Sequence, residues 1–275
     1  MADIRDNKEA LKWQIEMGVD EIIGEKPVNR FLEEDLKVAK PTSNVSPSHN
    51  VNPPKPKPKP KPVEKPPQEN INPLDPVTEA TQLVADVRSL EDLRKAILEF
   101  PHCSFRNTSN NLVFSDGNPE AWLMILGEAP GYEEDIKGKP FVGKSGRLLD
   151  KIFSDTGISR SNSKPHDSFY ITNTINWRPP GNRNPIKNEI DMFRPFVRKH
   201  IELINPKILV LTGNIACTAI LNQQGITKLR GKWLNIDNLD IMPIVHPAFL
   251  LRNPTFKKNT WQDVLAIKKK LVEME

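Results

Sequence analysis

The apolar residues from about position 77 to the end of the chain recur at two different spacings. Leu83, Val87 and Leu90 recur as on one face of a helix, whereas 208–212 is a short continuous apolar run typical of a buried strand. Strands that alternate with helices predict an α/β fold with a parallel sheet covered on both faces. The predicted helices are 77–99, 145–156, 188–204, 214–222 and 255–274, and the predicted strands are 122–126, 169–175, 208–212 and 241–245.

The residues before this region show a different pattern. Residues 4–23 carry apolar side chains among acids and bases at an imperfect helical spacing, which predicts a short amphipathic helix within a segment 1–40. Residues 41–76 are rich in Pro, Lys, Ser and Asn, and Lys alternates with Pro over 55–62. This composition opposes helix and sheet pairing and favours extended polyproline II, so it predicts a disordered linker. The third part, 77–275, is the predicted folded domain.

Composition narrows the function classes. Of the 275 residues, 37% are hydrophobic and 27% charged, and there is no apolar run of about 18 residues, as a membrane helix needs. The start of the chain lacks the basic-then-apolar order of a secretory signal, and the two cysteines, Cys103 and Cys217, form no paired pattern. These features argue against a disulfide scaffold and a membrane partner, and they predict a cytoplasmic location.

The charge is unevenly distributed. Residues 1–75 hold 12 Lys and Arg against 13 Asp and Glu, whereas the remaining 200 residues hold 27 against 22. The excess of basic residues therefore lies in the predicted folded domain. A modest basic excess suits a partner that carries phosphates, although many proteins that bind no nucleic acid share it.

Four segments with unusual turn chemistry follow strands or open helices. In open α/β sheets ligands bind beyond the carboxyl ends of the strands, where loops of this kind meet. We therefore expect the four segments to converge at one edge of the sheet. They are GEAPGYEED (127–135), PFVGKSG (140–146), TNTINWRPPGNRNP (172–185) and HPAFLLRNP (246–254).

These four motifs, in this order, resemble the signature of uracil-DNA glycosylases, and specifically of family 4. The resemblance covers roughly residues 95–265. It implies a three-layer α/β/α sandwich around a mainly parallel four-stranded sheet, which agrees with the alternation of helices and strands. It also implies base excision repair. The enzyme flips uracil out of DNA and hydrolyses its bond to the sugar, which leaves an abasic site.

Two residues match the catalytic positions of the family. Glu128 matches the acidic residue, and a carboxylate beside the sugar can stabilise an oxocarbenium-like transition state and position water. Glu134, in the same loop, stays open as a second candidate for this role. His246 matches the family's histidine, whose imidazole can donate to uracil O2 as negative charge collects on the leaving base.

Three further residues match the uracil-binding positions. Phe141 matches the aromatic residue on which the flipped base stacks. Asn173 matches the residue that reads uracil, because one amide offers a donor and an acceptor to the O4 and N3–H edge. Gly127, at the start of the first turn, belongs to the same set.

The resemblance also suggests how DNA is held. In the LLRNP segment, Leu250 or Leu251 would fill the gap left by the extruded nucleotide, and Leu250 is the better positional match. Phosphates would be held by turns, hydroxyls and cations. The candidates for these contacts are Lys144, Ser145, Arg178, Arg183 and Arg252.

The sequence departs from family 4 at the positions that ligate a [4Fe–4S] cluster. Cys103 matches the first cysteine, but Arg106, Trp177 and Phe193 occupy the other three positions. Such a cluster needs thiolate ligands, so one cysteine cannot anchor it. We predict no cofactor and no metal, and we expect the two aromatic residues to fill the vacated volume.

Several alternatives stay open at this stage. A related branch bonds covalently to DNA through an inserted basic loop, but none is visible over 130–147, which favours hydrolysis with release. We also expect the protein to be a monomer. An inactive DNA-binding module of the same fold is the main alternative function, and a small nucleotide hydrolase is a weaker one. Residues 1–40 are a candidate docking segment for a repair or replication partner. The range of damaged bases and the preference for single or double strands are undecided.

Overall fold

The computed structural model describes residues 75–275, and the predicted helix 4–23, nearly all of the linker 41–76 and the partner segment 1–40 lie outside them. The described part begins with α2 (Pro76–Ala85) and α3 (Leu90–Glu99). Asp75 caps α2 and Ser89 caps α3, each accepting a backbone N–H of the first turn. The predicted helix 77–99 is therefore two helices, because the cap at Ser89 starts a new one.

Within the described residues the sheet runs in the order β1-β3-β2-β4-β6-β5. Its four central strands are parallel and correspond to the four predicted strands. Two short antiparallel strands, which the apolar pattern missed, extend its edges. The central strands are β3 (Phe169–Asn173), β2 (Leu123–Gly127), β4 (Ile208–Thr212) and β6 (Leu239–Ile244), and the edge strands are β1 (Ser115–Gly117) and β5 (Leu234–Ile236).

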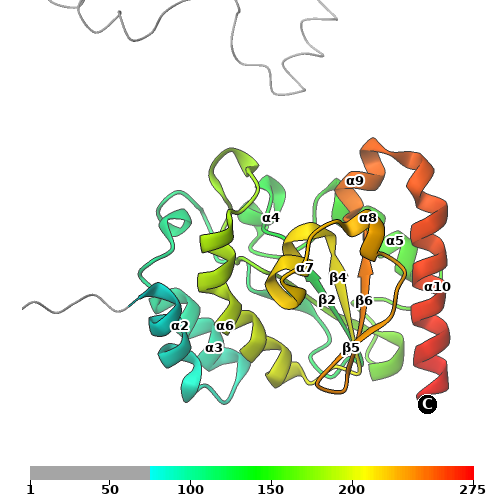
Figure 1. Cartoon of the computed structure of the whole chain (residues 1–275), viewed down its shortest axis with the longest axis horizontal. Helices are drawn as coiled ribbons and strands as arrows, with labels where there is room; N and C mark the ends of the chain where they lie inside the picture. Colours follow the sequence, from blue (N-terminus) through cyan, green and yellow to red (C-terminus); the bar gives the residue numbers. More distant parts are fainter. Residues whose placement is uncertain (1–74) are drawn as a thin grey trace, which may run out of the picture. The chain divides into compact units, whose positions relative to one another are not determined.

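Helices cover both faces of the sheet, which confirms the predicted three-layer sandwich (Figure 1). On one face, alternate strand residues such as Ile125 pack with α5 (Lys144–Ser154) and α10 (Lys257–Glu273). On the other face, residues such as Leu126 pack with α6 (Lys187–Ile204) and α7 (Gly213–Leu221). Every residue of β2, β3 and β4 is buried, as expected for strands covered on both sides.

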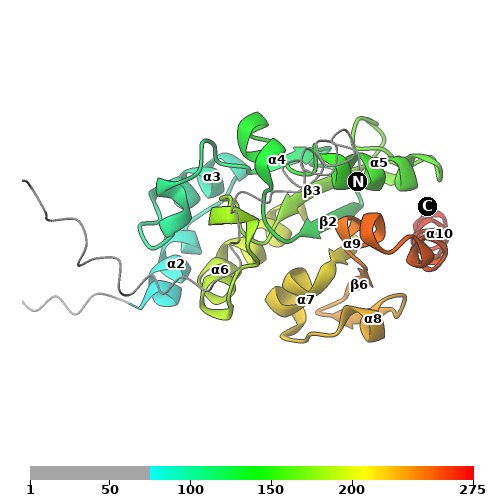
Figure 2. The ribbon, with the colours of Figure 1, turned by 90° about the horizontal axis from the view of Figure 1, so that it is seen from above.

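The remaining helices are short, and several follow the carboxyl ends of the central strands (Figure 2). No helix of the described part of the chain is long and apolar enough to cross a membrane. The short elements are α4 (Tyr132–Lys137), α8 (Ile226–Leu229), α9 (Pro247–Arg252), η3 (Ser104–Asn107), η4 (Pro165–Asp167), η5 (Pro180–Asn182) and η6 (Pro254–Phe256).

Candidate active site

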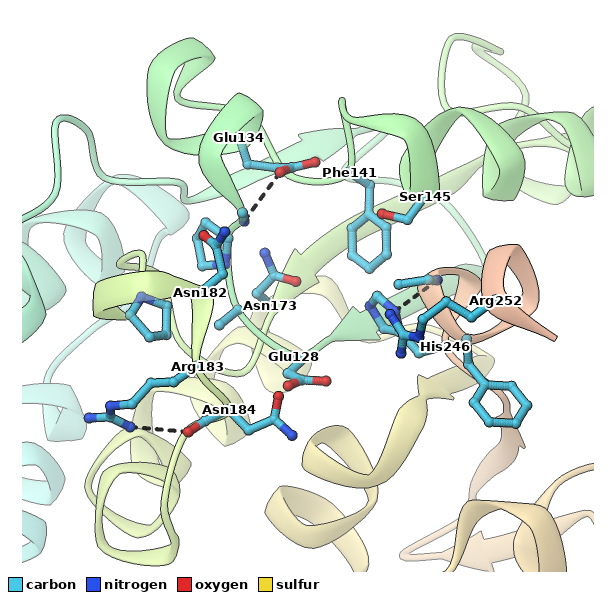
Figure 3. A pocket seen from close by; sticks show the side chains of 16 residues that line it. Glu128, Glu134, Phe141, Ser145, Asn173, Asn182, Arg183, Asn184, His246 and Arg252 are labelled. Carbon is cyan, nitrogen blue, oxygen red and sulfur yellow. Dashed lines mark hydrogen bonds between the residues drawn. The ribbon is translucent and has the colours of Figure 1, made fainter. Parts of the chain in front are cut away.

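A cavity of about 400 Å³ lies at the carboxyl ends of β2, β3 and β6 (Figure 3). All four motif segments contribute to its wall, so they converge as predicted. Of the predicted site residues, the cavity brings together Glu128, Glu134, Phe141, Ser145, Asn173, Arg183, His246 and Arg252. Its other lining residues are Ala129, Pro130, Gly131, Pro179, Asn182, Asn184, Ala248 and Phe249.

Gly127 is the last residue of β2 and keeps the cavity open. A Cβ atom at this position would lie 2.3 Å from Asn173 Oδ1 and 2.5 Å from the Phe141 ring. Both distances are far below van der Waals contact, so any side chain here would displace the amide or the ring. Gly127 does not line the cavity itself. Its lack of a side chain leaves room for the Phe141 ring and the Asn173 amide, which do.

Phe141 is held in a strained backbone conformation. Its φ of 54° lies in the left-handed region, which is rare for a bulky residue. Arg160 supports this turn by donating to the carbonyls of Pro140 and Phe141 at 3.0 and 3.1 Å. The Phe141 ring lies 5.7 Å from the His246 ring, between centroids, at an angle of 35°. Strain of this kind persists where the surroundings fix a functional geometry.

Asn173 ends β3 and projects its amide into the cavity (Figure 3). The residue is only 3% exposed, yet its side chain has no hydrogen-bond partner among residues 75–275. The neighbouring Thr174 instead satisfies the Gly127 carbonyl at 2.8 Å. Because this amide faces the cavity, a ligand there can use both its donor and its acceptor.

Glu128 and Glu134 both line the cavity but differ in their surroundings. Burial raises the pKa of the Glu128 carboxyl, and the Arg252 cation partly offsets this effect. The Glu128 backbone carbonyl accepts from the Ile175 N–H at 3.1 Å, but its carboxylate accepts no hydrogen bond within the described part of the chain. The Glu134 carboxylate, by contrast, accepts from the backbone N–H groups of Gly131, Val142 and Gly143 at 3.2, 2.9 and 2.8 Å. Glu134 thus ties two loops together, whereas the Glu128 carboxylate has no contact of this kind.

His246 caps α9, and this contact selects its tautomer. Its Nδ1 accepts a hydrogen bond from the Ala248 backbone N–H at 3.2 Å, so the proton of the neutral ring resides on Nε2. Burial, followed by the Arg252 charge, lowers the His246 pKa to about 4. At neutral pH the ring is therefore an uncharged donor through Nε2.

Residues 114–265, more than half of the chain, match the family model of the uracil DNA glycosylase superfamily. The chain belongs to the uracil-DNA glycosylase superfamily. It is 35% identical over 190 residues to the type-4 uracil-DNA glycosylase of Sulfurisphaera tokodaii, covering 66% of this chain and 84% of that protein.

Two further type-4 uracil-DNA glycosylases are similar to this chain over a comparable length. The protein of Saccharolobus solfataricus is 36% identical over 179 residues, covering 62% of this chain and 80% of its own length. That of Archaeoglobus fulgidus is 31% identical over 186 residues, covering 64% of this chain and 90% of its own. The resemblance to the family 4 branch of the uracil-DNA glycosylases is therefore confirmed.

The two leucines predicted as candidates for the wedge differ in exposure, and this difference favours Leu251 over the better positional match, Leu250. Leu250 is fully buried, whereas Leu251 is 46% exposed. In a helix, adjacent residues point about 100° apart, so only one of the two can face outward. In α9 the outward residue is Leu251.

The predicted phosphate-binding cations of the glycosylase site differ in availability. Arg183 is paired with Glu189 at 2.6 Å, and Arg178 donates to Asn182 at 2.7 Å. Lys144 and Arg252 are exposed and have no ion-pair partner among residues 75–275. These two cations are the more available for a phosphate.

The residues at the family 4 cluster positions do not fit an iron–sulfur group. Cys103, Trp177 and Phe193 are buried in one apolar cluster together with Phe105, and burial raises the Cys103 pKa to about 11. Iron needs the thiolate form of several cysteines. The described part of the chain has no group of three or more His, Cys, Asp and Glu side chains that could hold a metal ion.

Arg160 is the supporting residue that the sequence motifs did not reveal. It is 15% exposed and forms ion pairs with Asp116 and Asp150 at 3.1 and 2.7 Å, in addition to its contacts with the Pro140 and Phe141 carbonyls. It lies outside all four motifs of the superfamily signature, in a loop without regular spacing. No local pattern could therefore have identified it.

Proposed function

We propose that this protein is a monofunctional uracil-DNA glycosylase, which binds uracil flipped out of DNA and hydrolyses the bond between its N1 and the sugar C1′. The observation that carries this proposal is that Glu128, Phe141, Asn173 and His246 line one cavity. The similarity to type-4 uracil-DNA glycosylases supports the same activity.

Glu128 acts on the sugar side of the reaction. As the C1′–N1 bond breaks, its electron pair passes to uracil and positive charge develops on the sugar. The Glu128 carboxylate stabilises that charge and orients the water whose oxygen bonds to C1′. The lack of any competing hydrogen bond from the described residues leaves both carboxylate oxygens available for this role.

His246 acts on the base side. Its Nε2–H donates to uracil O2, where negative charge collects as the bond breaks, in the manner of an oxyanion hole. A neutral donor suits this step because its pKa of about 4 keeps it uncharged at working pH. The Nδ1 contact with the Ala248 N–H fixes the ring orientation before the base enters.

Phe141 and Asn173 select the base. The ring of Phe141 supplies a stacking surface, and the amide of Asn173 pairs with O4 and N3–H of uracil. Cytosine presents a donor and an acceptor in the reverse order, so it would leave the buried amide unsatisfied. Gly127 keeps the space between ring and amide free for the base.

The DNA backbone lies across the rim of the cavity. Leu251 of α9 fills the gap that the extruded nucleotide leaves. The available cations at the rim are Lys144 and Arg252, and Ser145 offers a hydroxyl beside them. Arg178 and Arg183 contribute charge while they keep their own protein contacts.

The proposal is tested with oligonucleotides that carry one uracil. The full chain is incubated with single- and double-stranded forms, and the DNA is then treated with alkali. Strand cleavage at uracil and release of free base, with no protein retained on the DNA in a denaturing gel, are expected. Binding without cleavage on either substrate would contradict the proposal and would favour an inactive DNA-binding module. An oligonucleotide with thymine in place of uracil is the control.

The rate of excision is expected to fall at acid pH because Glu128 becomes protonated. Burial raises its pKa above the ordinary 4.5 and Arg252 lowers it, so Arg252→Gln raises this pKa further and moves the acid limb to higher pH. His246 stays neutral above its pKa of about 4 and produces no limb near 6.5. The measurement is the single-turnover rate against pH with enzyme in excess, with Arg252→Lys as the control that keeps the charge. An acid limb that Arg252→Gln leaves unmoved would contradict this assignment.

We further propose that the protein functions without an iron–sulfur cluster. Trp177 and Phe193 pack with Cys103 in the volume where the family 4 resemblance places the ligands. Protein purified without oxygen is expected to show no cluster absorption and no stoichiometric iron, while it still excises uracil. Stoichiometric iron that is lost together with activity on chelation would contradict this expectation.

A further inference from the structure

Tyr132, the first residue of α4, is exposed beside the cavity. Its side chain is 59% exposed, which is unusual for an aromatic residue with no covering element. The guanidinium of Arg178 lies over its ring at 5.1 Å from the centroid. Arg178 thus lies against one face of the ring, while more than half of the residue stays exposed.

This pair is fixed in place by the loops that form the cavity wall. Arg178 Nε donates to Asn182 Oδ1 at 2.7 Å, and its carbonyl accepts from Ser109 Oγ at 3.1 Å. Tyr132 follows Gly131, whose backbone N–H donates to Glu134 at 3.2 Å. The Arg178 guanidinium and the backbone before Tyr132 are thus positioned before any ligand arrives, which lowers the entropic cost of stacking on this pair.

Tyr132 and Arg178 lie where DNA bound at the cavity would pass. Tyr132 and Arg178 are the chain neighbours of Gly131 and Pro179, which line the cavity. α9, which carries Leu251, contributes Arg252 to the cavity wall, across the cavity from Glu134 of α4 (Figure 3). A strand whose uracil enters the cavity must cross the rim, so nucleotides that flank the uracil pass close to both sides.

The chemistry of the surface favours a nucleobase over a protein. A stable protein interface buries about 800 Å² on each partner, whereas the exposed apolar side chains of α4 are only Tyr132 and Ile136 within the described residues. A single aromatic face backed by a cation is, by contrast, the form of a stacking platform for single-stranded nucleic acid, because every base offers a π-face.

We propose that Tyr132, backed by Arg178, is a stacking site for an unpaired base that flanks the uracil in single-stranded DNA. This inference rests on the proposed glycosylase function and assigns a substrate class to the same site. In duplex DNA the flanking bases stay paired and stacked, so the platform has no base to accept. The site therefore favours uracil in single strands.

The test compares Tyr132→Ala with Tyr132→Phe, which keeps the π-face, and with Ile136→Ala, an exposed residue one turn along the same helix. The probe is a single-stranded oligonucleotide with 2′-fluoro-2′-deoxyuridine flanked by 2-aminopurine, and the duplex form is measured in parallel. Tyr132→Ala is expected to weaken single-strand binding by about 5- to 100-fold and to remove the quenching of 2-aminopurine. Tyr132→Phe and Ile136→Ala should match the wild type, and duplex binding should be unchanged in all variants.

Two results would overturn the proposal. Unchanged single-strand affinity and quenching in Tyr132→Ala would exclude the stacking site and leave this surface to a protein partner. An equal loss of affinity for single strands and duplex would show that Tyr132 acts on DNA binding in general. The glycosylase function is tested separately, by excision of uracil by the wild type. If the wild type excises no uracil, 2-aminopurine quenching can still be compared between the variants.

Discussion

Replacing Glu128 with glutamine is expected to slow uracil excision by about 10³-fold, the effect typical of removing one charge-stabilising group from a transition state. Glutamine keeps the shape of the side chain but loses the negative charge that faces the developing sugar cation. Single-turnover rates on a uracil oligonucleotide measure this loss. DNA affinity should change little, because Glu128 acts when the bond breaks. A rate within a few-fold of the wild type would contradict the assignment.

The stability of this variant separates chemistry from folding. Burial raises the pKa of Glu128, so its ionised form is disfavoured in the folded state and reduces stability at neutral pH. Glu128→Gln should therefore be at least as stable as the wild type in thermal unfolding. Glu134→Gln is the matched comparison. It weakens three contacts to backbone N–H groups, with an expected cost of about 1–3 kcal/mol. If Glu134→Gln kept the thermal stability of the wild type but lost excision activity, the roles of the two carboxylates would be reversed.

Replacing His246 is expected to slow excision by about 10²- to 10³-fold, because the donor to uracil O2 is lost. His246→Ala also removes the N-cap of α9, at a cost of about 1 kcal/mol. His246→Asn keeps a capping acceptor but is too short to present a donor where Nε2 lies. The excision rate should fall by the same factor in both variants, whereas His246→Asn should be more stable to thermal unfolding than His246→Ala. Rates and thermal unfolding are measured together, and a wild-type rate in His246→Asn would exclude the Nε2 donor.

The central sheet could be predicted because β2, β3 and β4 are buried along their whole length and β6 over its last four residues, so that each strand shows a largely apolar run. The edge strands β1 and β5 are only three residues long and partly exposed. Such strands carry no periodic signal and form because neighbouring strands offer free backbone groups. The break between α2 and α3 depends on the local cap at Ser89 and not on the apolar spacing.

The cavity could be anticipated from motifs, but its fine geometry could not. Which leucine of α9 faces outward depends on the rotation of a six-residue helix, too short to show a periodic pattern. The roles of Arg160 and Glu134 arise from contacts with backbone groups of other loops. Backbone partners leave no trace in residue type, so sequence alone could not separate Glu134 from Glu128.

The central claim is that one cavity surrounds a single extruded uracil with a carboxylate, an imidazole, an aromatic ring and an amide. A crystal structure of the full chain with an oligonucleotide that carries 2′-fluoro-2′-deoxyuridine tests it most directly. We expect the uracil on the Phe141 ring, with O4 and N3–H paired to Asn173, O2 on His246 Nε2 and the sugar beside Glu128. A uracil that stays stacked in the DNA, or that binds elsewhere on the protein, would contradict the account.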